Sequence, residues 1–484
     1  MLCRVRGNTL RARCARSGIA LGLGNFAERC IRLARKIILV RLLAPDQFGL
    51  MSIVMAVSML FEAVADLGLK QAIIQSKKGA EQDYLNVTWW LQSIRGFALF
   101  TMAFLLAPLV SQFYKMPQLV PLLRTALIAI VINGLMSPKT HILQKNLRFG
   151  KWAFFTGGTH LLGTLLTLSL AFVIRNVWAL VIGLVGEAII RCLFSFCLCP
   201  FRPRLTLARQ SLNSIIRFAG GMLGLPILTA ITLQTDIIVL GKVVSTEKLG
   251  MYALALALSQ QPIGLLSSIF GPVLLPAFSQ KQDDKATLRN AVVEITTNAV
   301  LVGVPLTAFL IVYGRPILAT VYGTQYCAMA GPFGLLCGSM LVRMHTVILA
   351  AMYLAVNRPH LHRRLVLVFT LVIVCCMYPG TILGGLVGAA AVLLIANVIM
   401  LSLQVMIMPR LIGLGSKEYL RCWLSSAWLL PIILLPAALL RYLEIRTTIA
   451  NICVGGICCV LACLAGMFFW PRKQNLADTK ILAK

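Results

Sequence analysis

The sequence predicts an all-α polytopic membrane protein with about fourteen transmembrane helices. Of its 484 residues, 59% are hydrophobic and only 12% are charged, about half the charged fraction of an ordinary soluble domain. Apolar runs of about 20 residues, the length that one helical span needs, also follow one another along the chain. This composition excludes a soluble enzyme, and the abundance of apolar residues excludes intrinsic disorder.

The spans are expected where apolar runs alternate with loop signals. Breakers such as Ala44-Pro45-Asp46 and Asn357-Arg358-Pro359 fall between the runs. We interpret the first run as an uncleaved helix, because charged residues interrupt the apolar core that a signal peptide requires. The expected spans are 18–43, 48–74, 84–112, 119–138, 152–174, 177–199, 213–241, 249–278, 288–313, 329–356, 361–380, 382–409, 422–440 and 448–470.

The charge balance predicts the orientation of these spans. The chain has 45 Lys and Arg against 15 Asp and Glu, a formal net charge of +30. In a soluble protein this excess would suggest nucleic acid, but here most basic residues lie in the N-terminal tail, the loops after even-numbered spans and the C-terminal tail. Short cytoplasmic loops collect Lys and Arg. We therefore expect both termini in the cytoplasm and no nucleic-acid partner.

An internal repeat predicts two parallel six-helix lobes. Residues 37–58 match 238–259, with Gly49 on Gly250 and Asp46 on Glu247. Parallel repeats are a transporter architecture, with the substrate path between the halves. The expected organisation is a basic tail (1–17), an N-lobe (18–212), a C-lobe (213–410), two appended helices (411–471) and a cytoplasmic tail (472–484).

The loops leave no room for an enzyme domain. The longest stretch between expected spans, 314–328, is too short for a catalytic or nucleotide-binding domain. The 15 cysteines lie mostly inside apolar runs and form no CxxC pair, which is typical of small apolar filler. We therefore expect a protein that is not an enzyme and that needs no metal or cofactor.

The first span carries an unusual charged face. A charged side chain at mid-bilayer costs roughly 2.5–3.5 kcal/mol on insertion scales, so each one requires a reason. At about 100° per residue, five charged residues fall within an arc of about 120°. They are Glu28, Arg29, Arg32, Arg35 and Lys36. Four cations against one acid predict a wet, cation-lined cavity for an anionic ligand such as pyrophosphate, with Arg95 and Arg343 as further binding residues.

Acidic residues inside the spans are the candidates for coupling to an ion gradient. Asp66 and Asp236 lead, and Glu28 and Glu62 complete the set, because intramembrane carboxylates often carry protons or cations. A competing interpretation is that the membrane charges, including Glu187 with Arg191 four residues later, form structural ion pairs between helices.

Several motifs resemble one known family. Arg41-Leu-Leu-Ala-Pro-Asp-Gln-Phe-Gly-Leu50, Val177-Trp-Ala-Leu-Val-Ile-Gly183 and Leu275-Pro-Ala-Phe-Ser279 resemble the polysaccharide transporter branch of the multidrug/oligosaccharidyl-lipid/polysaccharide (MOP) flippase superfamily. The resemblance covers about residues 20–410. It implies a two-lobed helical transporter that moves undecaprenyl-pyrophosphate-linked oligosaccharide across the bacterial inner membrane by alternating access, for lipopolysaccharide or exopolysaccharide synthesis. It also implies coupling to H⁺ or Na⁺ and contact with membrane lipids and polysaccharide-assembly proteins.

Two alternatives remain open. A multidrug antiporter of the same superfamily exports cationic compounds and would call for a net-acidic cavity, which the cationic first span does not favour. A membrane glycosyltransferase or polymerase would need acidic residues on the outer face, where the expected loops offer only Asp46, Glu247 and Glu444.

Overall fold

A computed structural model describes residues 24, 28–64, 68–146, 148–204, 212, 215, 225–280, 284–442 and 451–466. Every regular element within these ranges is a helix. The chain divides into two compact units, Met1–Gly250 and Met251–Lys484. The internal sequence repeat predicts a different division, in which the second lobe begins at residue 213, and that division stays a prediction.

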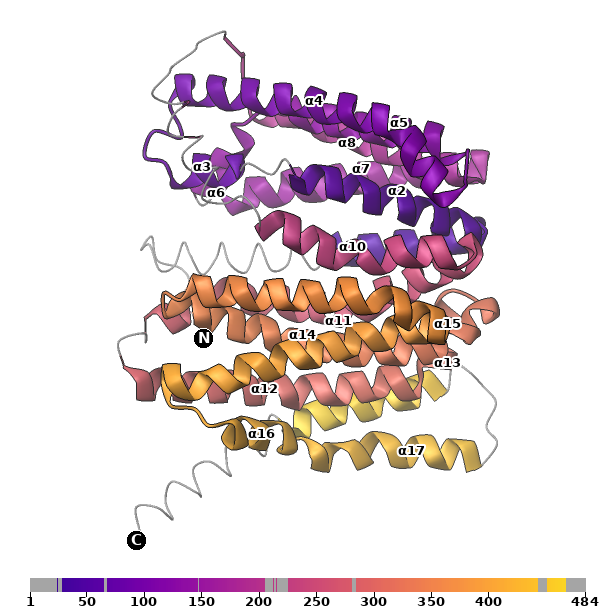
Figure 1. Cartoon of the computed structure of the whole chain (residues 1–484), viewed down its shortest axis with the longest axis vertical. Coiled ribbons are helices and arrows are strands. Elements are labelled where there is room, and N and C mark those ends of the chain that lie inside the picture. The colour runs from indigo at the N-terminus through magenta and orange to yellow at the C-terminus, as the bar shows by residue number, and fades with distance from the viewer. Residues whose placement is uncertain are drawn as a thin grey trace. The chain divides into compact units, whose positions relative to one another are not determined.

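The first unit is a bundle of long apolar helices with two short ones at one end (Figure 1). α4 packs on α5, α5 on α8, α8 on α7, and α10 on α2. The short helices α3 and α6 contact each other. The elements are a helix over 28–42, then α2 (Pro45–Val64), α3 (Leu69–Gln75), α4 (Gln82–Tyr114), α5 (Leu119–Gly134), α6 (Thr140–Lys145), α7 (Phe149–Ile174), α8 (Val177–Leu198) and α10 (Leu225–Val243).

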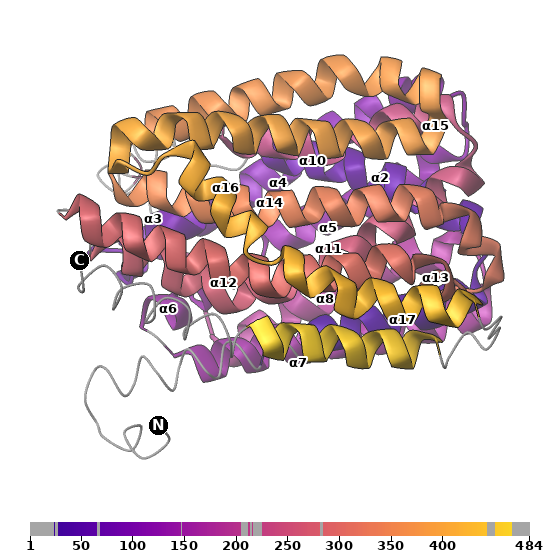
Figure 2. The ribbon, with the colours of Figure 1, turned by 90° about the horizontal axis from the view of Figure 1, so that it is seen from below.

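The second unit is built in the same way, and its helices can be followed in Figure 2. α14 packs along α15 and α12, while α16 and α17 lie against α12. The elements are α11 (Thr246–Ser279), which begins in the first unit, then α12 (Lys285–Val312), α13 (Gly314–Val321), η2 (Thr324–Met329), α14 (Ala330–Ala355), α15 (Pro359–Ile412), α16 (Ser416–Leu424), η3 (Ala427–Leu429), α17 (Leu430–Tyr442) and Asn451–Gly466.

The predicted fold class is confirmed. Within the described residues, nine helices are long and apolar enough to cross a membrane. α15 is two helices joined at Gly385, whose φ of 55° and ψ of −132° are not helical, so it supplies two of the predicted spans. With 28–42, α5, α11 and Asn451–Gly466, the described helices follow the order of the fourteen predicted spans.

One predicted span has a different form. The expected helix over 48–74 ends as α2 at Val64, and α3 begins after Gly68. Gly68 has φ of 61°, a left-handed conformation that glycine adopts at little cost and that a continuous α-helix cannot contain. The short α3 is therefore a separate element at the end of the bundle.

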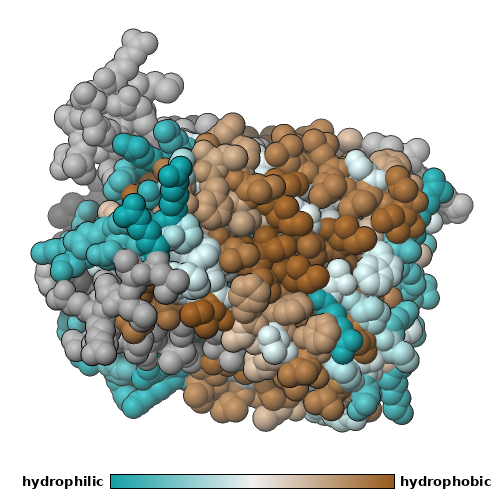
Figure 3. All heavy atoms as spheres, turned by 90° about the horizontal axis from the view of Figure 1, so that it is seen from above, coloured by the Kyte–Doolittle hydropathy of each residue, from teal (hydrophilic) through white to brown (hydrophobic). Residues whose placement is uncertain are grey.

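The outer surface of the first unit is apolar along its helices. Figure 3 shows a broad field of brown hydrophobic side chains with teal hydrophilic residues at left and right. On α4, five large apolar residues are more than half exposed: Ile94, Phe97, Leu105, Leu109 and Phe113. Such a surface is a liability in water, whereas lipid solvates it.

The internal repeat has a structural counterpart at the start of α2 and α11. These helices begin at Pro45 and Thr246, which the sequence match places at equivalent positions. A Cβ on Gly49 would lie 1.9 Å from the Thr246 carbonyl oxygen, and a Cβ on Gly250 would lie 1.8 Å from that of Pro45. This reciprocal contact is the pattern that a twofold axis generates, so it supports the repeat.

Candidate functional site

The charged face of the 28–42 helix lies against α7 and α8 of the first unit. Arg35 Nη1 donates to Glu187 Oε2 on α8 at 3.1 Å, and Glu28 pairs with Arg32 one turn along its own helix. The Arg32 side chain is 48% exposed and that of Arg35 is 24% exposed. The helix therefore holds one arginine near its surface and ties the other to a neighbouring helix.

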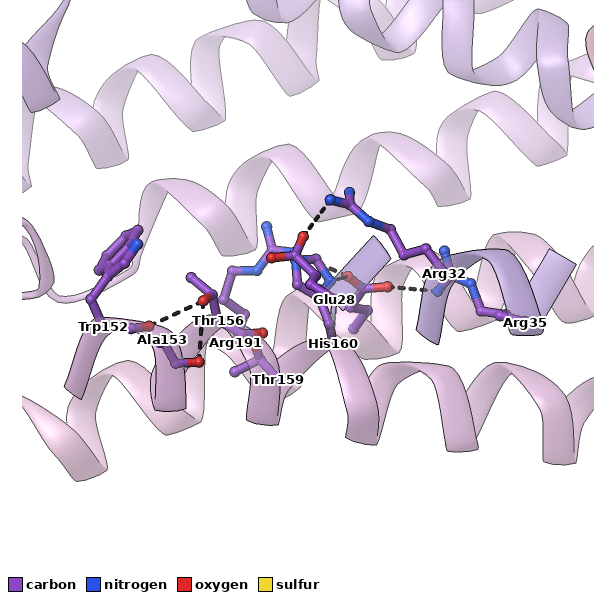
Figure 4. A network of polar contacts seen from close by, with 10 residues as sticks. Glu28, Arg32, Arg35, Trp152, Ala153, Thr156, Thr159, His160 and Arg191 are labelled. Atoms are coloured by element: carbon purple, nitrogen blue, oxygen red, sulfur yellow. Dashed lines mark hydrogen bonds and ion pairs between the residues drawn. The ribbon is translucent and has the colours of Figure 1, made fainter. Parts of the chain in front are cut away.

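Glu187 of α8 contacts charged or polar side chains from three helices, and Figure 4 shows three of these side chains, those of Arg35, His160 and Arg191. The Glu187 side chain is only 11% exposed, so its carboxylate must find partners within the protein. Besides Arg35, it accepts from Arg191 Nη2 at 3.1 Å and contacts His160 Nδ1 at 2.8 Å. Three side chains from three helices thus converge on one carboxylate.

Small residues make room for this carboxylate between α7 and α8. A Cβ on Gly163 would lie 2.5 Å from Cγ of Glu187, and a Cβ on Gly183 would lie 2.5 Å from Oγ1 of Thr167. Neither position could carry a side chain without moving its neighbour. The glycines therefore let α7 and α8 approach closely enough for His160 and Glu187 to meet.

The two carboxylates do not cancel the positive charge. Glu28 and Glu187 face Arg32, Arg35 and Arg191. Arg29 and Lys36, on the same helix, interact electrostatically with Arg32. These residues therefore form structural ion pairs between helices, as one interpretation of the sequence expects. They also keep an excess of positive charge, as the interpretation of a site for an anionic ligand expects. We call Glu28, Arg29, Arg32, Arg35, Lys36, His160, Glu187 and Arg191 the charged cluster.

The other predicted site residues lie on different elements. Arg95 is half-buried on α4, and Arg343 is half-buried on α14 of the second unit. Asp236 is buried in α10, where its Oδ1 accepts from the backbone N–H of Ile237 at 2.8 Å. Glu62 is exposed on α2. Asp66 lies outside the described residues. The binding and coupling roles predicted for these residues stay predictions.

Sequence reasoning missed His160. It is the one histidine inside the first-unit spans of the described chain, and its ring touches both carboxylates of the charged cluster. A signal was present, because small and polar residues recur at helical spacing through α7: Thr156, Thr159, Gly163, Thr164 and Thr167 share its face. Such a stripe marks the side of α7 that packs inside the protein.

A pocket lies in the second unit between α11, α12 and α14. Its lining is mainly apolar, with Leu306, Met340 and Met344 among its members and Ser259 and Thr307 as polar residues. None of the predicted site residues lines it. The predicted cavity between two lobes therefore stays a prediction.

The chain is similar to known proteins in sequence and to solved structures in fold. A family model described as "Polysaccharide biosynthesis protein" matches residues 38–331. The lipopolysaccharide biosynthesis protein WzxC of Escherichia coli (strain K12) is 25% identical over 426 residues, covering 87% of this chain and 85% of WzxC.

Two solved structures share the fold. The lipid II flippase MurJ, in an inward closed conformation, has a TM-score of 0.73 at 14% identity, covering 94% of this chain and 99% of that one. An inward-facing multidrug resistance MATE family transporter of the MOP superfamily has a TM-score of 0.62 at 14% identity, covering 79% of this chain and 95% of that one. At sequence identities this low, the similarity to these two structures shows only a shared fold.

Proposed function

Because the chain belongs to the family of polysaccharide biosynthesis proteins, whose model matches residues 38–331, we propose that it is a flippase. Its substrate is an oligosaccharide linked to undecaprenyl pyrophosphate, which it moves from the cytoplasmic to the outer leaflet for surface polysaccharide synthesis. The family match is the observation that carries this proposal, and it confirms the resemblance that the sequence motifs indicated. The protein is thus a multi-pass membrane transporter and not an enzyme.

The cationic excess of the charged cluster favours a diphosphate head group as ligand. Arginine binds phosphate oxygens through planar, charge-assisted pairs of hydrogen bonds. Arg32 is the most accessible arginine of those that pair in the cluster, with its side chain 48% exposed, and Arg29 and Lys36 add positive charge beside it. An incoming diphosphate would therefore compete with Glu28 for Arg32 and with Glu187 for Arg35.

The remaining parts of the proposal concern the transport cycle and its location. The protein acts in the bacterial inner membrane with both termini in the cytoplasm, since the predicted loops follow the positive-inside rule. It alternates access between the two faces, and an H⁺ or Na⁺ gradient drives the cycle through intramembrane carboxylates. Its partners are membrane lipids and polysaccharide-assembly proteins.

The multidrug antiporter remains the second candidate, because a MATE transporter shares the fold. A site for cationic drugs needs net negative charge, and the charged cluster has the opposite sign. Membrane glycosyltransferases and polymerases are the third candidate class. The family match does not favour them.

A reconstitution experiment separates the three candidates. The purified chain is placed in vesicles whose undecaprenyl-diphosphate-linked disaccharide bears a dithionite-sensitive fluorophore. If the chain is a flippase, labelled lipid from the inner leaflet reaches the outer leaflet, where added dithionite quenches its fluorophore. In protein-free vesicles the fluorescence of the inner leaflet should survive. Uptake of ethidium without lipid movement would support the antiporter. Growth of the saccharide chain on addition of donor sugar would support the enzyme.

A further inference from the structure

His160 lies between two carboxylates that come from different helices. Its side chain is 17% exposed. On one side, Nε2 is 3.2 Å from Glu28 Oε1 on the 28–42 helix; on the other, Nδ1 is 2.8 Å from Glu187 Oε1 on α8. Figure 4 shows the ring on α7 beside Glu28 and Arg191. One imidazole therefore links three helices through both of its nitrogen atoms.

A neutral ring cannot satisfy both contacts. A neutral imidazole has one N–H donor and one nitrogen lone pair, and an ionised carboxylate only accepts. Whichever tautomer forms, the lone pair would face a carboxylate oxygen within 3.2 Å. An imidazolium donates from both nitrogens and satisfies both carboxylates. Both ring nitrogens of His160 can therefore donate to a carboxylate only when the ring carries one proton more than its neutral form.

We infer that Glu28, His160 and Glu187 form a reversible proton-binding site, with the bound proton on the His160 ring. The inference rests on the proposed function and deepens it, because it places a proton-binding site beside the arginines proposed to bind the diphosphate and makes lipid binding depend on pH. Bound proton holds the 28–42 helix to α7 and α8. Loss of the proton turns one of the two hydrogen bonds into a repulsion between a nitrogen lone pair and a carboxylate oxygen. The contact of the 28–42 helix with α7 and α8 then weakens.

Several other charged groups of the described chain lie on the helices that meet at the ring, among them Arg29 and Lys36 of the 28–42 helix. The 28–42 helix presents Arg32 to Glu28 and Arg35 to Glu187, and α8 presents Arg191 to Glu187. α6 also packs on α7 and carries His141 and Lys145, whose ammonium donates to the Ser76 carbonyl at 2.6 Å. The arginines oppose an added proton and the two carboxylates favour it, so the site exchanges its proton when this balance changes.

A diphosphate changes the balance in one direction. Its negative charge attracts Arg32 and Arg35 away from the two carboxylates, and it favours a nearby positive ring. Both effects strengthen proton binding, so the anionic lipid and the proton bind together. By linkage, uptake of one proton makes lipid binding tighten by up to about tenfold for each unit that the pH falls.

A metal ion is a less suitable occupant of this site. Within the described part of the chain, no group of three or more His, Cys, Asp or Glu side chains is arranged to hold one. The ring nitrogens already occupy the space between the two carboxylates, and two arginines contact Glu187. A proton requires no additional space.

The first test measures proton uptake on ligand binding. The probe is undecaprenyl-diphosphate-linked N-acetylglucosamine, whose diester phosphates do not titrate near neutral pH. Calorimetry at pH 7 in buffers of different ionisation enthalpy gives the number of protons taken up per lipid bound. We expect uptake approaching one proton for the full-length protein and close to none for His160→Gln. His360→Gln, which removes an exposed histidine at the start of α15, should behave as the unmodified protein.

A second variant guards against misfolding of the first. In Glu28→Gln the amide donates to the ring lone pair, so a neutral His160 satisfies both neighbours and no extra proton is needed. Proton uptake should again fall to near zero while His160 is retained. Unchanged uptake in a folded His160→Gln or Glu28→Gln protein would overturn the inference.

An independent measurement separates this inference from the proposed function. The chain contains five histidines, and ¹⁵N spectra of the ligand-free protein report the protonation of each ring. The resonance absent from His160→Gln should show a neutral ring at the upper end of the range from pH 5.5 to 8.5 and a doubly protonated ring at the lower end. A neutral His160 ring from pH 5.5 to 8.5 would overturn the inference whether or not the lipid binds. A protonated ring in a protein that binds no lipid would overturn the flippase alone.

Discussion

Replacement of Gly49 or Gly250 by alanine should destabilise the first unit. In each case the new Cβ would clash with a backbone carbonyl oxygen of the neighbouring helix. A Cβ at Gly250 would lie 1.8 Å from the Pro45 carbonyl oxygen, and a Cβ at Gly49 would lie 1.9 Å from that of Thr246. A carbon and a carbonyl oxygen need about 3.3 Å, so the ends of α2 and α11 must part by about 1.5 Å. The obstructing atoms belong to the backbone, which cannot rotate out of the way.

The expected size of the effect combines two opposing terms. Overpacking costs about 1–3 kcal/mol, whereas alanine in a helix gains about 0.5–1 kcal/mol over glycine. The net loss in free energy of unfolding for Gly49→Ala or Gly250→Ala is therefore between about 0 and 2.5 kcal/mol, and it is about 1–3 kcal/mol relative to an alanine substitution that makes no clash. Because the two positions are in contact, the double variant should lose less than the sum of the single losses. The first alanine has already moved the helices apart.

The assay is the thermal unfolding midpoint in detergent, at matched protein concentration. Gly157→Ala is the control, since a Cβ there meets no atom within 4 Å and the variant should unfold at the same or a slightly higher temperature. A Gly250→Ala protein as stable as Gly157→Ala would refute the close contact. Destabilisation at only one of Gly49 and Gly250 would refute the twofold relationship.

Two further predictions concern other groups. Glu187→Ala should cost about 2–4 kcal/mol of unfolding free energy, because it leaves partly buried cations without their carboxylate. Glu418→Ala should cost less than about 1 kcal/mol, because the ion pair of Glu418 with Arg289 is far more exposed. Equal losses of stability in melting experiments on the two variants would contradict this ranking. Burial and the charge of Lys70 lower the pKa of His141, which lies outside the spans, to about 4. The unfolded chain therefore binds more protons between pH 6.5 and 4, so acidification through this range should destabilise the protein. His141→Gln should reduce the loss between pH 7.5 and pH 5, and an identical loss would show that His141 does not contribute.

The architecture could be predicted from the sequence because bilayer thickness fixes the length of each apolar run. The break after α2 was missed, since an apolar pattern does not report the left-handed conformation of Gly68. The kink at Gly385 lies near the start of the predicted span 382–409, close to the break that the sequence places between this span and 361–380. Local composition is thus informative about spans and much less so about where short helices form.

The candidate site was only partly predictable for a different reason. Helical periodicity placed Glu28, Arg32 and Arg35 on one face, because that depends on a single segment. Their partners come from α7 and α8, more than a hundred residues away in sequence, and no local pattern encodes such pairing. Glu187 and Arg191 were recognisable as intramembrane charges, but the link through His160 depends on the close approach that Gly163 and Gly183 permit.

The most direct test of the account is the affinity of the undecaprenyl-diphosphate probe for a protein with Arg32→Gln and Arg35→Gln. Each charge-assisted hydrogen bond contributes about 1.5–3 kcal/mol, so loss of both arginines should weaken binding about 100-fold or more and stop lipid movement in vesicles. Arg32→Lys with Arg35→Lys should recover part of the affinity. Lys77→Gln with Lys78→Gln, which removes the same charge from an exposed loop, should leave it unchanged. Equal affinity in the Arg32→Gln/Arg35→Gln protein and the loop control would contradict the assignment of the charged cluster as the diphosphate site.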